Sequence, residues 1–172
     1  LRRWQDGAAA IRDMLVRGAP LIGATAAWSL YLAARESSDQ ASRAVDAAAR
    51  ELADTSPTSV NLRWAIERVL AAVRKAPRCS DLASLTESGA LAICDEDIGI
   101  CRGIGERGLT LIEALARQNP GRPVNVLTHC NAGALATINY GTATAPVYLA
   151  HRAGIDVHVW VDETRPRNQG SQ

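Results

Sequence analysis

Residues 124–161, VNVLTHCNAGALATINYGTATAPVYLAHRAGIDVHVWV, decide the fold of this chain. The stretch begins with a short apolar run at 124–128 and ends with a second one at 156–161. Between them, residues 134–153 carry a pattern that predicts a helix. A strand, a helix and a strand in this order predict a βαβ unit whose two strands run parallel.

A break in the pattern precedes this unit. The run RQNPGRP at 117–123 gathers two prolines and a glycine, which interrupt regular structure. On its N-terminal side, residues 1–118 place apolar residues at helical spacing and predict a helical domain. The expected helical segments are about 7–17, 21–35, 39–53, 58–75 and 81–115, the last interrupted near 103–108.

The predicted fold class is therefore α/β, with an N-terminal helical domain at 1–118 followed by a parallel-sheet domain. Parallel sheets are normally covered on both faces, which two strands alone cannot achieve. We therefore expect 119–172 to be the first βαβ unit of a Rossmann-like domain that is incomplete in this chain. The chain starts at Leu1 and ends in a loop-like run, so we expect the natural protein to continue.

The composition is that of an ordinary globular protein, with 47% hydrophobic and 22% charged residues and a formal net charge of +1. The basic residues are scattered, so neither a nucleic-acid nor a membrane partner is predicted. No apolar run reaches the roughly 18 residues of a membrane span. The four cysteines form no CxxC pair, so we expect no metal site, and reduced thiols in a cytoplasmic protein.

Two loops leave the carboxyl ends of the predicted strands, where open parallel sheets bind ligands. They are THCNAGA at 128–134 and DETRPRNQG at 162–170. If the strands are neighbours, Cys130 and the second loop face one crevice. The predicted helix would begin just after Cys130, and a helix N-terminus attracts anions and favours a thiolate. Cys130 is therefore a candidate for an activated thiol, and the alternative is a structural Cys in a turn.

The other polar residues of these loops allow two interpretations each. The second loop is either a solvated loop with local salt bridges or a phosphate-binding segment. Its side chains are Asp162, Glu163, Arg165, Arg167 and Gln169. His129 precedes Cys130, but neighbours on an extended chain point in opposite directions, which favours a core imidazole over a catalytic one. We treat His151, His158 and the remaining cysteines (Cys79, Cys94 and Cys101) as structural.

Several stretches, in this order and almost end to end, resemble the methylthioribose-1-phosphate isomerases of methionine salvage. They are IRDMLVRGAPLIGATAA, PTSVNLRWAIERV, THCNAGALAT, YGTATAPVYLAH and VHVWVDETRPRNQG. The family is shared with the alpha, beta and delta regulatory subunits of translation initiation factor 2B. The Cys of THCNAG is typical of the isomerase branch.

The resemblance implies an aldose–ketose isomerisation of 5-methylthioribose 1-phosphate to 5-methylthioribulose 1-phosphate, with no metal or organic cofactor. It implies that Cys130 is catalytic and that Gln169 helps to bind the phosphate. It also implies substrate contacts from Arg17, Gly18 and Ala19. Family members are typically homodimers, so a homodimer that binds a small sugar phosphate is expected.

Two departures from the family pattern keep other functions open. The family's catalytic Asp lies beyond Gln172, so we expect little or no activity from this chain alone. Ser56 stands where the family usually has an Arg that contacts substrate, and a lost charge-assisted contact costs about 1.5–3 kcal/mol. The alternatives are an isomerase of ribose 1,5-bisphosphate or 5-deoxyribose 1-phosphate, and a non-catalytic regulatory subunit.

Overall fold

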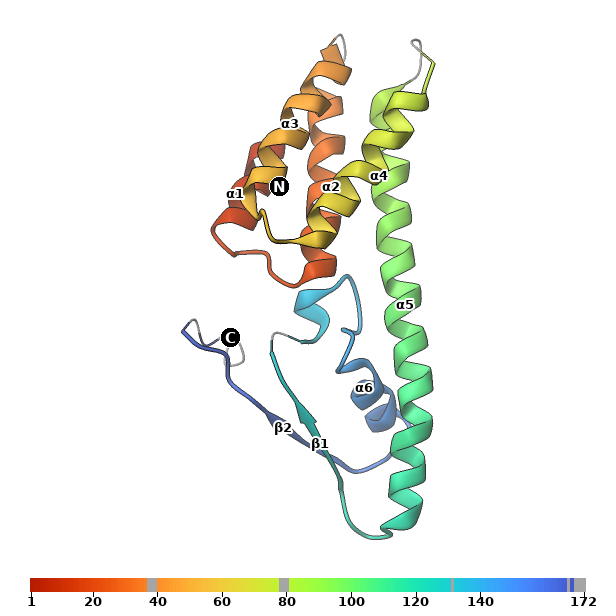
Figure 1. Ribbon diagram of the computed structural model, residues 1–172. Coiled ribbons are helices and arrows are strands. Elements are labelled where there is room, and N and C mark those ends of the chain that lie inside the picture. Colours follow the sequence, from red (N-terminus) through yellow and green to blue (C-terminus); the bar gives the residue numbers. More distant parts are fainter. Residues whose placement is uncertain (37–39, 78–80, 131, 167, 169–172) are drawn as a thin grey trace. The chain divides into compact units, whose positions relative to one another are not determined.

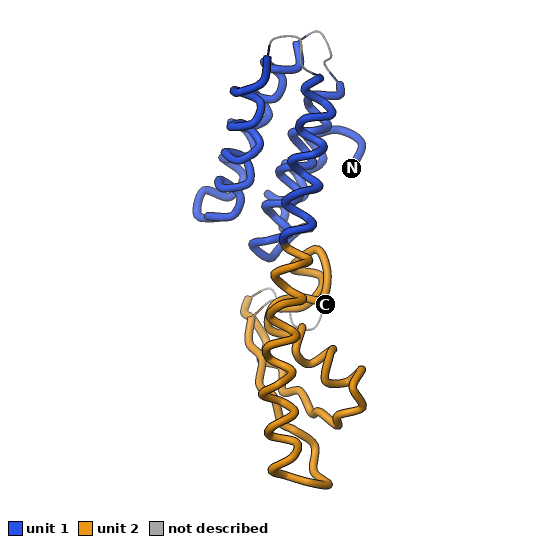
Figure 2. Tube along the Cα trace, turned by 90° about the vertical axis from the view of Figure 1, so that its right-hand side faces the viewer, with its two compact units in different colours: residues 1–96 blue, residues 97–172 orange. Residues whose placement is uncertain are grey.

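The computed structural model describes residues 1–36, 40–77, 81–130, 132–166 and 168. The chain divides into two compact units, Leu1–Glu96 and Asp97–Gln172 (Figure 2). This boundary falls inside a helix, α5 (Leu82–Gln118), whereas the sequence pattern changes only after residue 118. The C-terminal part of α5 joins the second unit because it packs against the helix that connects the strands.

The first unit is a helical bundle around a central helix. Its helices are α1 (Trp4–Arg12), α2 (Ala19–Glu36), α3 (Ala41–Thr55), α4 (Val60–Lys75) and the first part of α5. Helix α2 contacts α1, α3 and α4 (Figure 1). The α2 residues Ala26, Ala27 and Leu30 are fully buried, and their mostly small side chains allow close helix packing. The structure confirms the helix predicted at about 21–35.

Helix α4 begins at a side-chain cap and buries only some of its hydrophobic residues. The hydroxyl of Ser59 accepts the backbone N–H of Leu62 over 3.4 Å, which satisfies one of the unpaired amides at the helix start. Val69 is buried on the core face of α4. Trp64 is 45% exposed, and the guanidinium of Arg68 lies over its ring at 5.3 Å. The buried face of α4 is therefore narrower than its number of hydrophobic residues implies.

The second unit contains the predicted pair of parallel strands. It comprises the C-terminal part of α5, β1 (Val124–Thr128), the 3-10 turn η2 (Ala134–Ala136), α6 (Ala145–Arg152) and β2 (Val157–Val161). The strands pair in parallel, with Val124 opposite Val157. Helix α6 lies between the strands and α5, and Ile112, Val124 and Ala150 form the buried core there (Figure 1). The α/β fold class is confirmed.

Helix α5 has no interruption near 103–108, which corrects the prediction. Two glycines of this stretch serve close packing against α6 instead of breaking the helix. A Cβ added to Gly108 would lie 2.4 Å from the Cγ of Pro146, and one added to Gly105 would lie 2.9 Å from a methyl of Leu149. Glycine is favoured both where a helix ends and where two helices pack closely, so the sequence pattern cannot distinguish these two roles.

The helix predicted over 134–153 is wrong in its first part. Only the 3-10 turn Ala134–Ala136 and α6, which begins at Ala145, are helical. The segment between them turns back through Tyr140 and Gly141, with φ angles of 67° and 77°. The hydroxyl of Thr137 bonds to loop backbone rather than to a helix, which is how threonine competes with helical hydrogen bonding.

Candidate functional site

Cys130 lies just beyond the carboxyl end of β1 and is exposed. Its φ angle is 68°, a left-handed conformation that costs a non-glycine residue about 1–3 kcal/mol and persists only where the surroundings hold it. No α-helix begins beside it, because Gly133, at φ 117°, leads into the short turn η2. The predicted helix N-terminus next to Cys130 is therefore wrong. The predicted position of the thiol at the carboxyl end of the strand is confirmed, and the thiol is exposed.

The two loops at the strand ends are joined directly. The Nδ1 of His129 lies 3.3 Å from the Oδ2 of Asp162. The backbone N–H of Asp162 donates to the carbonyl of Thr128 over 3.1 Å, which continues the pairing of the strands into the loops. The side chain of His129 is 70% exposed, so the predicted core imidazole is wrong. Parallel pairing thus brings the THCNAGA loop and the start of the DETRPRNQG loop together.

The segment after Cys130 is a closely braced loop. A Cβ at Gly141 would lie 2.5 Å from the backbone of Gly133, so these two glycines pack backbone to backbone. Thr137 is 3% exposed, and its hydroxyl accepts the N–H of Gly141 over 3.1 Å. Asp97 of α5 accepts the N–H of Ile138 over 2.8 Å. These contacts fix the loop that carries Cys130 to the helix behind it.

The other described cysteines are less accessible: Cys101 is buried and Cys94 is half-buried. Cys101 is fully buried, and burial together with the nearby charge of Asp97 raises the pKa of its thiol. The sulfur of Cys94 accepts the indole N–H of Trp28 over 3.4 Å. Cys79 lies outside the described residues. Of the cysteines that the structure describes, Cys130 alone is exposed, so it is the one presented for chemistry.

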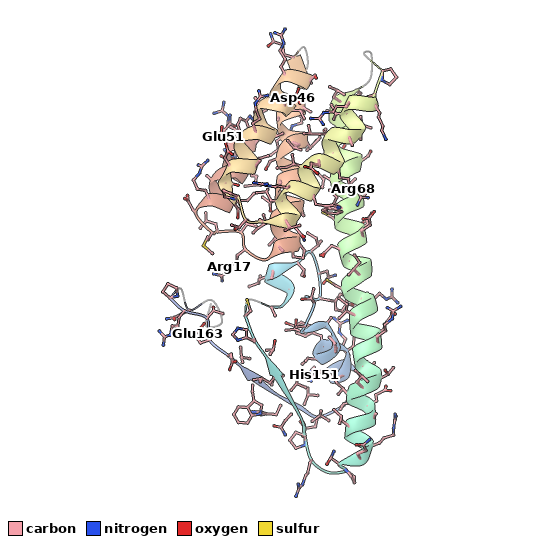
Figure 3. The ribbon with its side chains drawn as sticks, viewed as in Figure 1. Arg17, Asp46, Glu51, Arg68, His151 and Glu163 are labelled. Atoms are coloured by element: carbon pink, nitrogen blue, oxygen red, sulfur yellow. The ribbon has the colours of Figure 1, made fainter. Side chains whose placement is uncertain are left out.

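The candidate residues Arg17, Gly18 and Ala19 lie in the first unit, where α2 begins. Gly18 has a φ angle of 92°, which favours glycine, and its carbonyl accepts the N–H of Ile22 over 3.0 Å. Ala19 is the first residue of α2. Figure 3 shows Arg17 in the connection before this helix. The turn thus presents a helix N-terminus preceded by an Arg, a combination suited to anions.

Ser56 and the loop after β2 complete the set of candidate positions. Ser56 caps the C-terminus of α3, and its carbonyl accepts the N–H of Ser59 over 3.0 Å, so it lies in the turn between α3 and α4. Gln169 lies outside the described residues, as does Arg167. Glu163 is the second residue after β2 (Figure 3), and its carboxylate accepts the N–H of Thr164 over 2.7 Å.

Neither a metal cluster nor a membrane span is found in the described ranges. No group of three or more His, Cys, Asp or Glu side chains among these residues could hold a metal ion. None of the helices described is both long and apolar enough to cross a membrane.

The sequence analysis did not predict the contact between His129 and Asp162. Both residues follow the ends of parallel strands, and this placement indicated that they could lie close together.

The protein is thus an α/β protein with a helical N-terminal part, two parallel strands and an exposed thiol at a strand end. The chain belongs to the initiation factor 2 subunit family, whose model matches residues 15–172. The methylthioribose-1-phosphate isomerase of Methylorubrum populi is 55% identical over 96% of this chain and 44% of its own length. The enzyme of the same name from Rhodospirillum centenum is 54% identical over 97% of the chain and 44% of its own length.

Two solved structures share the fold over nearly the whole chain. The 5-methylthioribose 1-phosphate isomerase of Pyrococcus horikoshii OT3 matches with a TM-score of 0.85 at 35% identity, over 99% of this chain and 47% of that one. The delta subunit of translation initiation factor eIF-2B from A. fulgidus matches with a TM-score of 0.83 at 38% identity, over 100% and 49%. The chain thus spans about half the length of its relatives, and the resemblance seen in the sequence is confirmed.

Proposed function

We propose that this chain belongs to an aldose–ketose isomerase that converts 5-methylthioribose 1-phosphate to 5-methylthioribulose 1-phosphate in methionine salvage. The observation that carries the proposal is the 55% identity, across 96% of the chain, to a relative named for this reaction. The exposed thiol of Cys130 at the carboxyl end of a parallel strand supports it, because ligands of open parallel sheets bind there.

The reaction needs a positioned proton donor or acceptor. Phosphate on the anomeric oxygen keeps the sugar ring from opening freely, so the enzyme must help to break the bond between C1 and the ring oxygen. A hydrogen must then move from C2 to C1, as a proton or as a hydride, in a site that excludes water. Cys130 is the catalytic residue in this proposal, and the reaction needs no metal or organic cofactor.

The substrate contacts come from two parts of the sequence. Arg17 supplies a charge for the phosphate, and Gly18 and Ala19 supply backbone at the start of α2, where amide groups favour anions. Gln169 adds an amide that hydrogen-bonds to the phosphate. Together these groups select a small phosphorylated sugar.

The second unit is, in this proposal, the beginning of a Rossmann-like domain of a cytoplasmic homodimer. Leu127 and Trp160 lie opposite each other in the parallel pair and are 70% and 56% exposed. Parallel strands are normally covered on both faces, which supports a larger sheet around them. A catalytic Asp that follows Gln172 in the family then acts with Cys130, so residues 1–172 alone are expected to show little or no turnover.

Substitution of Cys130 in the full-length protein tests the proposal. Cys130→Ser is expected to lower kcat at least about 100-fold, the smaller end of the range for a lost acid–base group, while substrate binding changes only a few-fold. Cys94→Ser is the matched control, since it removes a thiol outside the site. A Cys130→Ser enzyme with the wild-type rate would rule the catalytic thiol out.

The similarity to an initiation factor subunit keeps a regulatory function as the second candidate. A subunit that senses a sugar phosphate or nucleotide binds its ligand without converting it, and Cys130→Ser leaves it unchanged. Ser56 bears on a third candidate, an isomerase of another pentose phosphate. Parallel assays with ribose 1,5-bisphosphate and 5-deoxyribose 1-phosphate separate this candidate from the first, and Ser56→Arg is expected to tighten phosphate binding about 10-fold.

A further inference from the structure

The strand ends present a second group able to carry a proton, the imidazole of His129. Its Nδ1 faces the carboxylate of Asp162 at 3.3 Å, and the next residue in the chain is Cys130. The side chains of His129 and Asp162 are 70% and 56% exposed. Glu163, the residue after Asp162, is the other acidic side chain at this strand end and accepts the N–H of Thr164. The pair therefore includes the residue that precedes Cys130 in the chain, and it is open to a ligand.

This pair is held by the sheet. The backbone N–H of Asp162 donates to the carbonyl of Thr128 over 3.1 Å, one step beyond the paired residues Thr128 and Val161. The carboxylate and the imidazole are thus carried by neighbouring strands at a fixed register. Exposed ion pairs contribute little to folding stability, so the arrangement is poorly explained as a stabilising contact.

We propose that His129 is a catalytic acid–base residue of the isomerase and that Asp162 is its positioning residue. This inference rests on the proposed function. A carboxylate that accepts the Nδ1–H of a histidine fixes the tautomer and the ring orientation, which leaves Nε2 to exchange a proton with a substrate. The contact between His129 and Asp162 has this form, and Cys130 is left to act on the carbon-bound hydrogen.

In the proton balance of the reaction, His129 donates one proton and accepts another. Opening the ring breaks the bond between C1 and the ring oxygen, and the ring oxygen gains a proton from Nε2 of the imidazolium. When the ketone forms at C2, the C2 hydroxyl loses a proton, which returns to Nε2. The hydrogen on C2 moves to C1 either as a hydride or as a proton carried by a second base. Both routes therefore need the same donor and acceptor, and His129 ends the cycle as it began.

The test uses the full-length protein with 5-methylthioribose 1-phosphate as substrate. His129→Asn keeps a polar group toward Asp162 but lacks the second ring nitrogen, and it is expected to lower kcat at least about 100-fold with KM within a few-fold. His129→Ala is expected to regain part of its rate when imidazole is added to the solution. His151→Asn, on α6 (Figure 3), is the matched control with the wild-type rate.

Asp162 is tested through its dependence on His129. Asp162→Asn is expected to lower kcat about 10-fold in the wild-type background and to have no further effect in His129→Ala, because it acts through the imidazole. Circular dichroism of each variant excludes unfolding as the cause. An active wild type with a His129→Asn variant at the wild-type rate, or effects of the two residues that simply add, would overturn this inference alone. An inactive wild type would overturn the proposed function and this role with it.

Discussion

The carboxylate of Asp97 accepts the backbone N–H of Ile138 over 2.8 Å and thereby ties α5 to the loop that follows Cys130. Asp97→Ala leaves this amide without its acceptor. Hydrogen bonds to charged groups contribute about 1.5–3 kcal/mol, so we expect the free energy of unfolding to fall by about that amount. Urea denaturation of the purified chain measures the change.

A local measurement separates this loop contact from general damage to the helix. Amide hydrogen exchange at Ile138 is expected to accelerate in Asp97→Ala more than exchange elsewhere in α5. Asp95→Ala is the matched control, since it removes an exposed carboxylate from the same helix. Equal exchange rates at Ile138 in Asp97→Ala and the wild type would contradict the anchoring role.

The thiols of Cys130 and Cys101 are expected to differ in reactivity. Cys101 is fully buried, and burial followed by the charge of Asp97 raises the pKa of its thiol, so little thiolate forms near neutral pH. Cys130 is exposed. Iodoacetamide at neutral pH should therefore alkylate Cys130 well before Cys101, as peptide mass spectrometry can show. In Cys130→Ser the early alkylation should vanish, and early alkylation of Cys101 would contradict the packing described.

The periodic segments of this fold were predictable, while its loop geometry was not. Apolar spacing placed the helices of the first unit, and two short apolar runs gave β1 and β2 in parallel. The predicted interruption of α5 was wrong because Gly105 and Gly108 allow α6 to pack closely against α5 and do not end the helix. The left-handed φ of Cys130 is uncommon for a residue that carries a Cβ, so the sequence pattern did not predict it.

The sequence predicted where the candidate site lies, but not which side chains contact each other there. Parallel strands bring their carboxyl ends to one edge, which sufficed to place Cys130 beside the loop that starts at Asp162. The contact between His129 and Asp162 lies one residue beyond the last paired residues of the strands, where no sequence pattern fixes the side chains. The rule that neighbouring side chains alternate applies only to extended chain, and Cys130, with a φ angle of 68°, is not extended.

The ion pair between Arg68 and Glu96 should make the first unit sensitive to acid. Arg68 of α4 (Figure 3) donates hydrogen bonds from both terminal guanidinium nitrogens to the carboxylate of Glu96 of α5, and this hydrogen bonding lowers the pKa of the Glu96 carboxyl. A carboxyl with a lowered pKa in the folded state adds stability above its unfolded pKa, and this stability is lost as the pH falls through the folded value.

Glu96→Gln should therefore lower the melting temperature slightly at neutral pH, and the difference from the wild type should disappear in acid below the folded pKa. Both residues are partly exposed, so the effect is expected to be small. Glu67→Gln makes the same change in charge at an exposed position of α4 and should leave the melting temperature unchanged. A difference for Glu96→Gln that persists in acid would show that packing, and not the ion pair, was lost.

The contact between Gly141 and Gly133 predicts that the loop after Cys130 tolerates no side chain at Gly141. A Cβ there would lie 2.5 Å from the backbone of Gly133 and 2.6 Å from the hydroxyl of Thr144, on a residue with φ 77°. Gly154→Ala is the matched control, because Gly154 has φ 76° and no described atom lies within 4 Å of its added Cβ. Both variants carry the cost of a left-handed alanine, about 1 kcal/mol, but only Gly141→Ala adds a collision.

We therefore expect Gly141→Ala to lose about 1–3 kcal/mol more unfolding free energy than Gly154→Ala, in the range of overpacked interiors. Because the displaced loop carries Cys130, the alkylation rate of that thiol should change in Gly141→Ala and stay at the wild-type value in Gly154→Ala. Urea denaturation and iodoacetamide labelling of the two variants measure these effects. Equal stability of the two alanine variants would mean that the glycine backbones do not touch in solution.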